Sequence, residues 1–95
     1  MSKELSEVLN LFRNEEFLKA EKKCSILLKK IKPNFELLNI YALILFKLKR
    51  YEESIWQWNK TIQMNSNFYF GYNNLGNVFL LKKNLTEALK NYEKA

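Results

Sequence analysis

The chain has 95 residues, of which 47% are apolar, 15% aromatic and 27% charged, and its formal net charge is +6 at pH 7. A chain of this length makes one small domain, and its apolar content predicts a packed fold rather than a disordered segment. It contains no histidine, one cysteine, two glycines and one proline. These counts exclude imidazole catalysis, an internal disulfide and most zinc sites, and they favour helices over β-hairpins.

Apolar residues recur at helical spacing in six stretches, with breaks near 14, 33, 49, 66 and 83. The predicted helices cover 2–13, 15–31, 35–48, 51–64, 68–81 and 85–95. The links between them are short, so successive helices should run antiparallel and form three hairpins.

Local signals mark several of these boundaries. Asn14, followed by the glutamates at 15 and 16, predicts an N-cap with an acidic first turn. Pro33 should end the second helix, because the residue before proline disfavours helical geometry. Asn84 and Glu87 have the spacing of a capping box.

Many of the cations fall at or just past the predicted helix C-termini: Arg13, Lys29, Lys30, Lys47, Lys49, Arg50, Lys82 and Lys83. Cations there complement the helix dipole, which favours a solvated charge distribution over a functional basic patch. The N-terminal stretch does not resemble a signal peptide, and the longest apolar run, Ile40–Phe46, is far shorter than the roughly 20 residues of a membrane span. A cytoplasmic location is therefore expected.

The sequence repeats itself at an interval of 34 residues. Small residues of the predicted second helices recur at Ala20, Ser54 and Ala88. Bulkier residues follow each of them by four positions, at Cys24, Trp58 and Tyr92. Self-similarity at a period of this size is typical of a solenoid, in which small residues let helix backbones approach closely. These bulkier positions are expected in the core, whereas Trp56 is either an exposed contact anchor or partly buried.

In the third unit, the residues with the clearest pattern are Tyr72, Leu75, Gly76, Phe79, Ala88, Tyr92 and Ala95. They resemble the W-x2-L-G-x2-Y opening and the A-x3-F/Y-x2-A closing of the tetratricopeptide repeat, with Tyr and Phe in place of Trp and Tyr. The second unit resembles it less closely, and the first keeps mainly Phe17, Ala20, Cys24 and Leu27. The resemblance implies an all-α fold of three antiparallel helix hairpins stacked as a right-handed solenoid. It implies a single domain over 1–95 with units 1–34, 35–68 and 69–95, and the incomplete last unit favours a fragment of a longer array or an end covered by another copy.

In arrays of this family, the first helix of each hairpin lines a concave groove that holds the partner. The resemblance and helical spacing place the following residues on that side: Leu5, Ser6, Leu9, Arg13, Glu36, Asn39, Ile40, Leu43, Lys47, Phe70, Asn73, Asn74, Asn77 and Leu81. Asparagine carries donors and an acceptor, so it can bracket a peptide backbone, while apolar neighbours supply side-chain pockets. The candidate peptide-binding set is Asn39, Ile40, Leu43, Lys47, Phe70, Asn73, Asn74 and Asn77.

No phosphate-binding loop, catalytic triad or metal cluster is found in the sequence. The expected function is therefore a non-enzymatic interaction module that binds a peptide or protein segment and needs no cofactor and no metal. One alternative is a self-association module that forms a homo-oligomer through the uncapped C-terminal end. Another is a substrate-docking fragment of a larger enzyme, such as a glycosyltransferase or sulfotransferase. Neither a nucleic acid nor a membrane is expected as a partner, and Leu5, Asn39 and Asn73 show no base-reading code.

Overall fold

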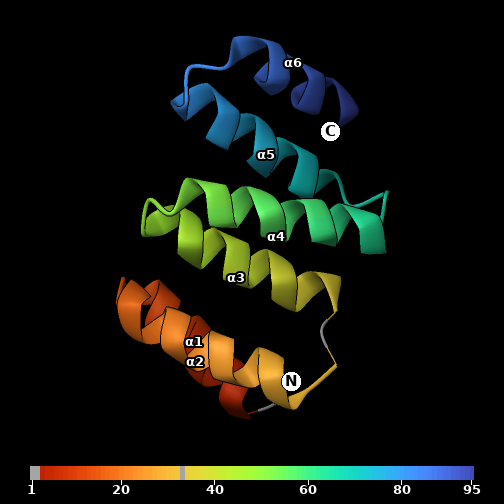
Figure 1. The fold of residues 1–95 in the computed structure, drawn as a ribbon. Helices are drawn as coiled ribbons and strands as arrows, with labels where there is room; N and C mark the ends of the chain where they lie inside the picture. The colour runs from red at the N-terminus through yellow and green to blue at the C-terminus, as the bar shows by residue number, and fades with distance from the viewer. Residues whose placement is uncertain (1–2, 33) are drawn as a thin grey trace.

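The computed structural model describes residues 3–32 and 34–95. These residues form six helices: α1 (Lys3–Arg13), α2 (Phe17–Lys30), α3 (Phe35–Lys47), α4 (Tyr51–Met64), α5 (Tyr69–Leu81) and α6 (Leu85–Lys94). The helices pair as three hairpins, α1/α2, α3/α4 and α5/α6 (Figure 1). The hairpins stack because α2 packs against α3 and α4 packs against α5, giving an elongated body of 39 × 24 × 18 Å.

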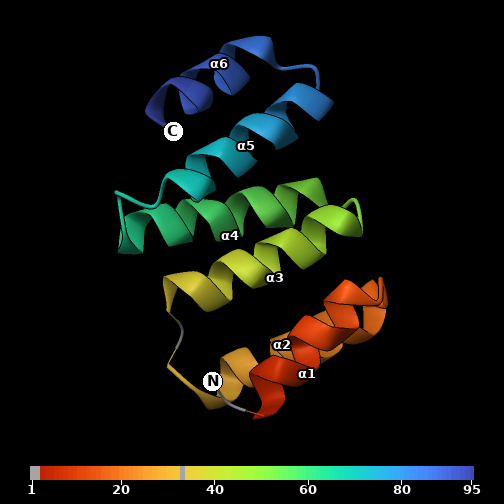
Figure 2. The ribbon, with the colours of Figure 1, turned by 180° about the vertical axis from the view of Figure 1, so that it is seen from behind.

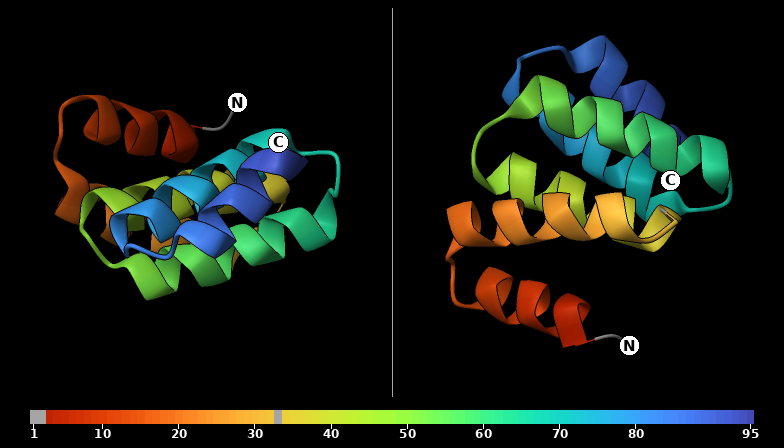
Figure 3. Two further views of the ribbon diagram at one scale, coloured as in Figure 1. Left: turned by 90° about the horizontal axis from the view of Figure 1, so that it is seen from above. Right: turned by 60° about the horizontal axis from the view of Figure 1, so that its bottom comes forward.

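The stack has two different sides. Figure 2 shows α1 in front of α2, whereas in Figure 1 α2 covers α1. Seen from above, in the left panel of Figure 3, α1 lies on one side of the stack and α4 on the other.

No helix among residues 3–32 and 34–95 is long and apolar enough to cross a membrane.

The six predicted helices are confirmed, with boundaries that agree to within two residues at the described positions. The predicted start at Ser2 and the signal at Pro33 lie outside the described residues. The Asn84 cap is confirmed, because its Oδ1 accepts a hydrogen bond from the Glu87 N–H at 3.2 Å. The reciprocal half of the predicted capping box is not seen, since the Asn84 N–H donates to Phe79 O. A cap that the sequence analysis missed starts α3, where Asn34 Oδ1 accepts from the Leu37 N–H at 2.9 Å.

The predicted N-cap at Asn14 is wrong. The Asn14 N–H still donates to Asn10 O, so this residue belongs to the turn that ends α1, and Glu16 is the residue that precedes α2. Glu15 between them has a left-handed backbone with φ of 61°. The chain therefore needs three residues to reverse, and the acidic pair lies in the turn rather than in the first turn of α2.

This turn occurs in all three hairpins. Lys49 and Lys83 have φ of 63°, and both lie a multiple of 34 residues from Glu15. The next residue in each turn donates its N–H five residues back: Glu16 to Leu11, Arg50 to Leu45 and Asn84 to Phe79, at 2.8 to 2.9 Å. A helix often ends in this way, with one residue in the left-handed conformation and the next N–H bonded to a carbonyl group of the last helical turn that has no partner within the helix. The 34-residue period of the sequence is thus also a period of the backbone.

Two apolar clusters hold the stack together. The first joins the first hairpin to α3 and contains Val8, Ala20, Cys24, Leu27, Leu37 and Ile44. The second joins the second hairpin to α5 and contains Ala42, Trp58, Leu75 and Val78. The small residues Ala20, Ser54 and Ala88 are all buried, as predicted from the close approach of the helices.

Candidate binding surface on the first helices

The first helices of the second and third hairpins are joined by a pair of asparagines. Asn39 on α3 accepts a hydrogen bond from Asn74 Nδ2 on α5 at 3.3 Å. The same Asn39 Oδ1 accepts from Trp58 Nε1 on α4 at 2.8 Å. Both lone pairs of this oxygen are therefore used within the protein, and the contact fixes α5 against the second hairpin.

Asn77 is also held inside the protein. Its Oδ1 accepts a hydrogen bond from Tyr92 OH at 2.5 Å, which links α5 to α6. Tyr92 follows Trp58 by 34 residues, so the aromatic residue at this position of the second helix donates to an asparagine of the preceding helix in both hairpins. The structure thus gives Asn39, Asn74 and Asn77 a structural task in addition to any contact with a ligand.

Phe70 and Asn73 lie at the start of α5 and are exposed; 71% of Phe70 is accessible. Together they line a cavity of about 500 Å³. The remaining lining residues come from the first residues of α3 and α5, the α4–α5 link and the end of the chain: Phe35, Asn65, Asn67, Phe68, Tyr69 and Ala95. The lining contains no Asp, Glu, Lys, Arg or His, so the side chains of the cavity offer aromatic surface, hydroxyl and amide groups without a formal charge at pH 7.

The aromatic rings of this cavity support one another. The Phe35 and Phe68 ring centroids are 5.2 Å apart with an edge-to-face orientation, and those of Phe68 and Phe70 are 5.8 Å apart. Edge-to-face pairs at this distance are favourable beyond simple burial. The rings therefore form a preorganised apolar wall in which Phe70 is the outermost member.

The other predicted binding residues are spread along the stack. Ile40 lines a smaller cavity of about 180 Å³ together with Leu5 and Leu9 of α1. Leu43 packs against the second apolar cluster, and Lys47 is exposed at the end of α3. The structure therefore brings Phe70 and Asn73 together in one cavity and Asn39 and Asn74 together in one hydrogen bond. Ile40 lines a different cavity from Phe70 and Asn73.

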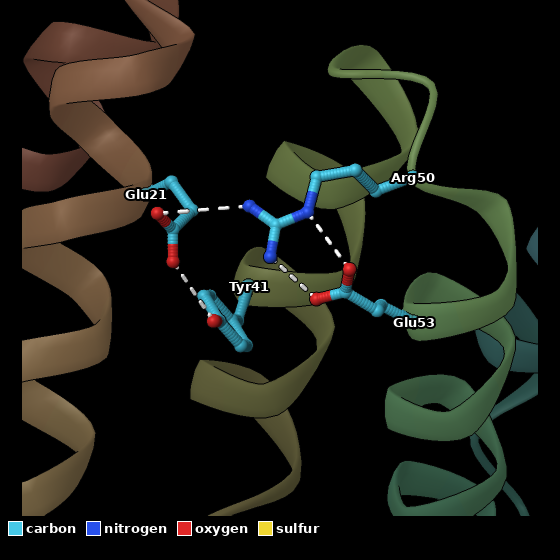
Figure 4. Close-up of polar contacts among 4 residues, drawn as sticks. All are labelled: Glu21, Tyr41, Arg50 and Glu53. Carbon is cyan, nitrogen blue, oxygen red and sulfur yellow. Dashed lines mark hydrogen bonds and ion pairs between the residues drawn. The ribbon is translucent and has the colours of Figure 1, made fainter.

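A polar network that the sequence analysis missed lies between the first two hairpins (Figure 4). Tyr41 OH donates to Glu21 Oε2 at 3.0 Å, and Arg50 Nη1 lies 3.7 Å from Glu21 Oε1. Arg50 also holds Glu53 through two hydrogen bonds, of 2.9 and 2.5 Å. Burial, together with the bond to Glu21, raises the pKa of Tyr41 to about 12, and the bond from Arg50 lowers the pKa of Glu53.

A departure from the repeat is the signal that could have found this network. The residues 34 positions after Glu21 and Tyr41 are Ile55 and Leu75, which belong to the second apolar cluster. A charged residue and a tyrosine where the next unit has aliphatic residues indicate an interface of different chemistry.

Two observations concern metal binding and the thiol of Cys24. No group of three or more His, Cys, Asp or Glu residues there could hold a metal ion. Burial raises the pKa of the Cys24 thiol to about 12, so it is protonated at neutral pH and is a poor nucleophile.

Comparison with known proteins gives no assignment: no family model matches the chain, and no curated protein matches it significantly.

Proposed function

We propose that this protein is a non-enzymatic interaction module of the tetratricopeptide type, a right-handed stack of hairpins that binds an extended peptide or protein segment along its first helices. The observation that carries the proposal is the uncharged aromatic cavity at the start of α5. Apolar residues that stay exposed around a cavity are a common mark of a binding site.

The composition around the cavity supports an uncharged or weakly charged ligand segment. Residues 61–81 contain no Asp, Glu, Lys or Arg, although 27% of the whole chain is charged. Phe70 supplies an apolar contact, and the amide of Asn73 supplies donors and an acceptor for a peptide backbone. Burying an exposed aromatic side chain contributes about 1.5 to 3 kcal/mol, so Phe70 should dominate the affinity.

The experiment is a peptide-array screen against the whole chain, followed by calorimetric titration of the strongest peptide. We expect Phe70→Ala to weaken binding roughly 30-fold, which corresponds to about 2 kcal/mol. Asn73→Ala should cost about 1 kcal/mol, the usual contribution of one hydrogen bond. The matched control is Leu89→Ala, which removes a similarly exposed apolar side chain from α6.

Asn73 is a better test than Asn74 or Asn77, because those two side chains bond within the protein and their loss would also change stability. Unchanged affinity in both Phe70→Ala and Asn73→Ala would show that the cavity is not the binding site. A screen that finds no peptide above background would contradict the proposed function itself.

A second candidate function is self-association through the last hairpin. The side chains of Leu80, Leu81, Leu85 and Leu89 are all exposed there. If they form a contact between copies, light scattering will give a mass above 11.4 kDa that rises with concentration. The double variant Leu85→Gln, Leu89→Gln should then return the protein to a monomer.

A further inference from the structure

The outward side of α2 has a composition that the proposed function does not use. The helix carries five lysines, at 19, 22, 23, 29 and 30, and one acidic residue, Glu21. The Glu21 side chain is only 17% exposed, because it turns toward Tyr41 and Arg50 of the second hairpin (Figure 4). The solvent-facing side of α2 is therefore purely cationic among its charged groups.

Two aliphatic residues lie among these lysines. Leu18 is 69% exposed and Ile26 is 53% exposed. Leu18, Lys22, Ile26 and Lys29 follow one another at helical spacing, so they form a single stripe about 16 Å long. These four residues are called the α2 stripe below.

The cations of the stripe are available to a partner. Lys19 pairs with Glu16 and Lys23 pairs with Glu7, whereas no ion pair between residues of the described chain holds Lys22, Lys29 or Lys30. The second helices of the other two hairpins differ, because α4 exposes Glu52 and Glu53 and α6 exposes Glu93. The stripe is thus a local feature and does not follow simply from the net charge.

We propose that the α2 stripe binds the surface of an anionic lipid bilayer. Lysine stems can lie along the acyl boundary while their ammonium groups contact acidic headgroups, and the aliphatic side chains between them can enter the interface. Nucleic-acid phosphates would use the lysines but gain little from Leu18 and Ile26, so the alternating pattern favours lipid. The expectation that the protein has no membrane partner rested on the lack of a spanning segment and on cations that complement helix C-termini. A surface contact needs no spanning segment, and Lys22 lies in the middle of α2 rather than in its last turn.

The test is co-sedimentation of the whole chain with vesicles of phosphatidylcholine alone and with vesicles containing about 30% phosphatidylserine, at low and high salt. Each lysine near an anionic surface strengthens binding about fivefold, so Lys22→Gln, Lys29→Gln should weaken partitioning roughly 25-fold. The matched control Lys60→Gln, Lys90→Gln removes the same charge from α4 and α6. Leu18→Gln, Ile26→Gln removes the apolar part of the stripe and keeps its charge, and circular dichroism checks that each variant is folded.

The proposal requires salt-sensitive binding to the anionic vesicles that both stripe variants lose and the control keeps. Absence of binding to anionic vesicles at low salt would overturn it. Equal loss in the control would show that net charge alone acts. The protein could instead bind a single-stranded oligonucleotide and no vesicles, with an affinity that Leu18→Gln, Ile26→Gln does not change. That result would show that the partner of the α2 stripe is a nucleic acid and not a lipid bilayer.

Discussion

Gly76 of α5 packs directly against the Tyr92 ring of α6, and replacing it with alanine should destabilise the third hairpin. A Cβ atom at this position would lie 2.6, 2.7 and 2.9 Å from three atoms of the Tyr92 ring. These distances are too short for carbon atoms in contact, so something must move. The ring cannot move without cost, because Tyr92 OH is bonded to Asn77 Oδ1.

The size of the effect is a difference between two opposing terms. Inserting a methyl group into a packed contact costs about 1 to 3 kcal/mol. Replacing glycine with alanine inside a helix stabilises the folded state by about 1 kcal/mol when nothing clashes. The expected net loss is about 1 kcal/mol, which lowers the melting temperature of a domain this size by roughly 4 to 8 °C.

Urea unfolding followed by circular dichroism measures this loss, and the second glycine provides a control. A Cβ on Gly71 would lie 3.1 Å from Ile62 Cγ1, an atom of an aliphatic side chain that can adjust, so Gly71→Ala should change stability by less. In a Tyr92→Leu background the clash is gone, and Gly76→Ala should become stabilising by up to about 1 kcal/mol. An increase in stability of Gly76→Ala in the otherwise unchanged protein would refute the reasoning.

Three further predictions concern groups that are wholly or partly buried. The pKa of Tyr41 is raised from 10.0 to about 12 in the folded protein, so its contribution to stability is present below pH 10 and is lost between pH 10 and 12. The urea midpoints at pH 9 and pH 11 should therefore differ less in Tyr41→Phe than in the unchanged protein. An equal difference in the two proteins would contradict this. The Cys24 thiol should react with a thiol reagent at pH 8 only as fast as the protein opens, so the rate should rise with urea, and immediate reaction in native buffer would be inconsistent with its burial. Ala88→Leu should overpack the contact between α5 and α6 and cost about 1 to 3 kcal/mol, and an unchanged unfolding midpoint would mean that this hairpin packs differently.

The fold could be predicted because its signals are local. Helical periodicity, short breaks and a 34-residue repeat predicted six helices and the buried positions of Ala20, Trp58 and Ala88. The predicted cap at Asn14 is wrong because Asn14 still belongs to the turn that ends α1. The turn could not be located from the sequence, because its left-handed position is occupied by Glu15 and not by a glycine.

The candidate site was less predictable because it depends on contacts between helices. Spacing placed Asn39 and Asn74 on first helices, but it could not show that one side chain bonds to the other across 35 positions. The aromatic cavity also depends on a contact between distant parts of the chain, because the rings of Phe35 and Phe68 come together only when α3 and α4 have packed as a hairpin. The predicted role of these residues in binding remains a prediction for the peptide experiments.

The contact between Glu21, Tyr41 and Arg50 has a consequence for how the hairpins recognise one another. Hairpins with similar sequences can stack in the wrong order or exchange with those of another chain. The second hairpin presents Tyr41 and Arg50 to its neighbour, and only the first hairpin has a glutamate to meet them, since the equivalent residues later in the chain are Ile55 and Leu89. Stacking any other hairpin at this place would leave a half-buried tyrosine and a guanidinium facing an aliphatic side chain. The polar network therefore favours one order of the hairpins over the others. The apolar contacts alone would discriminate less between alternative orders.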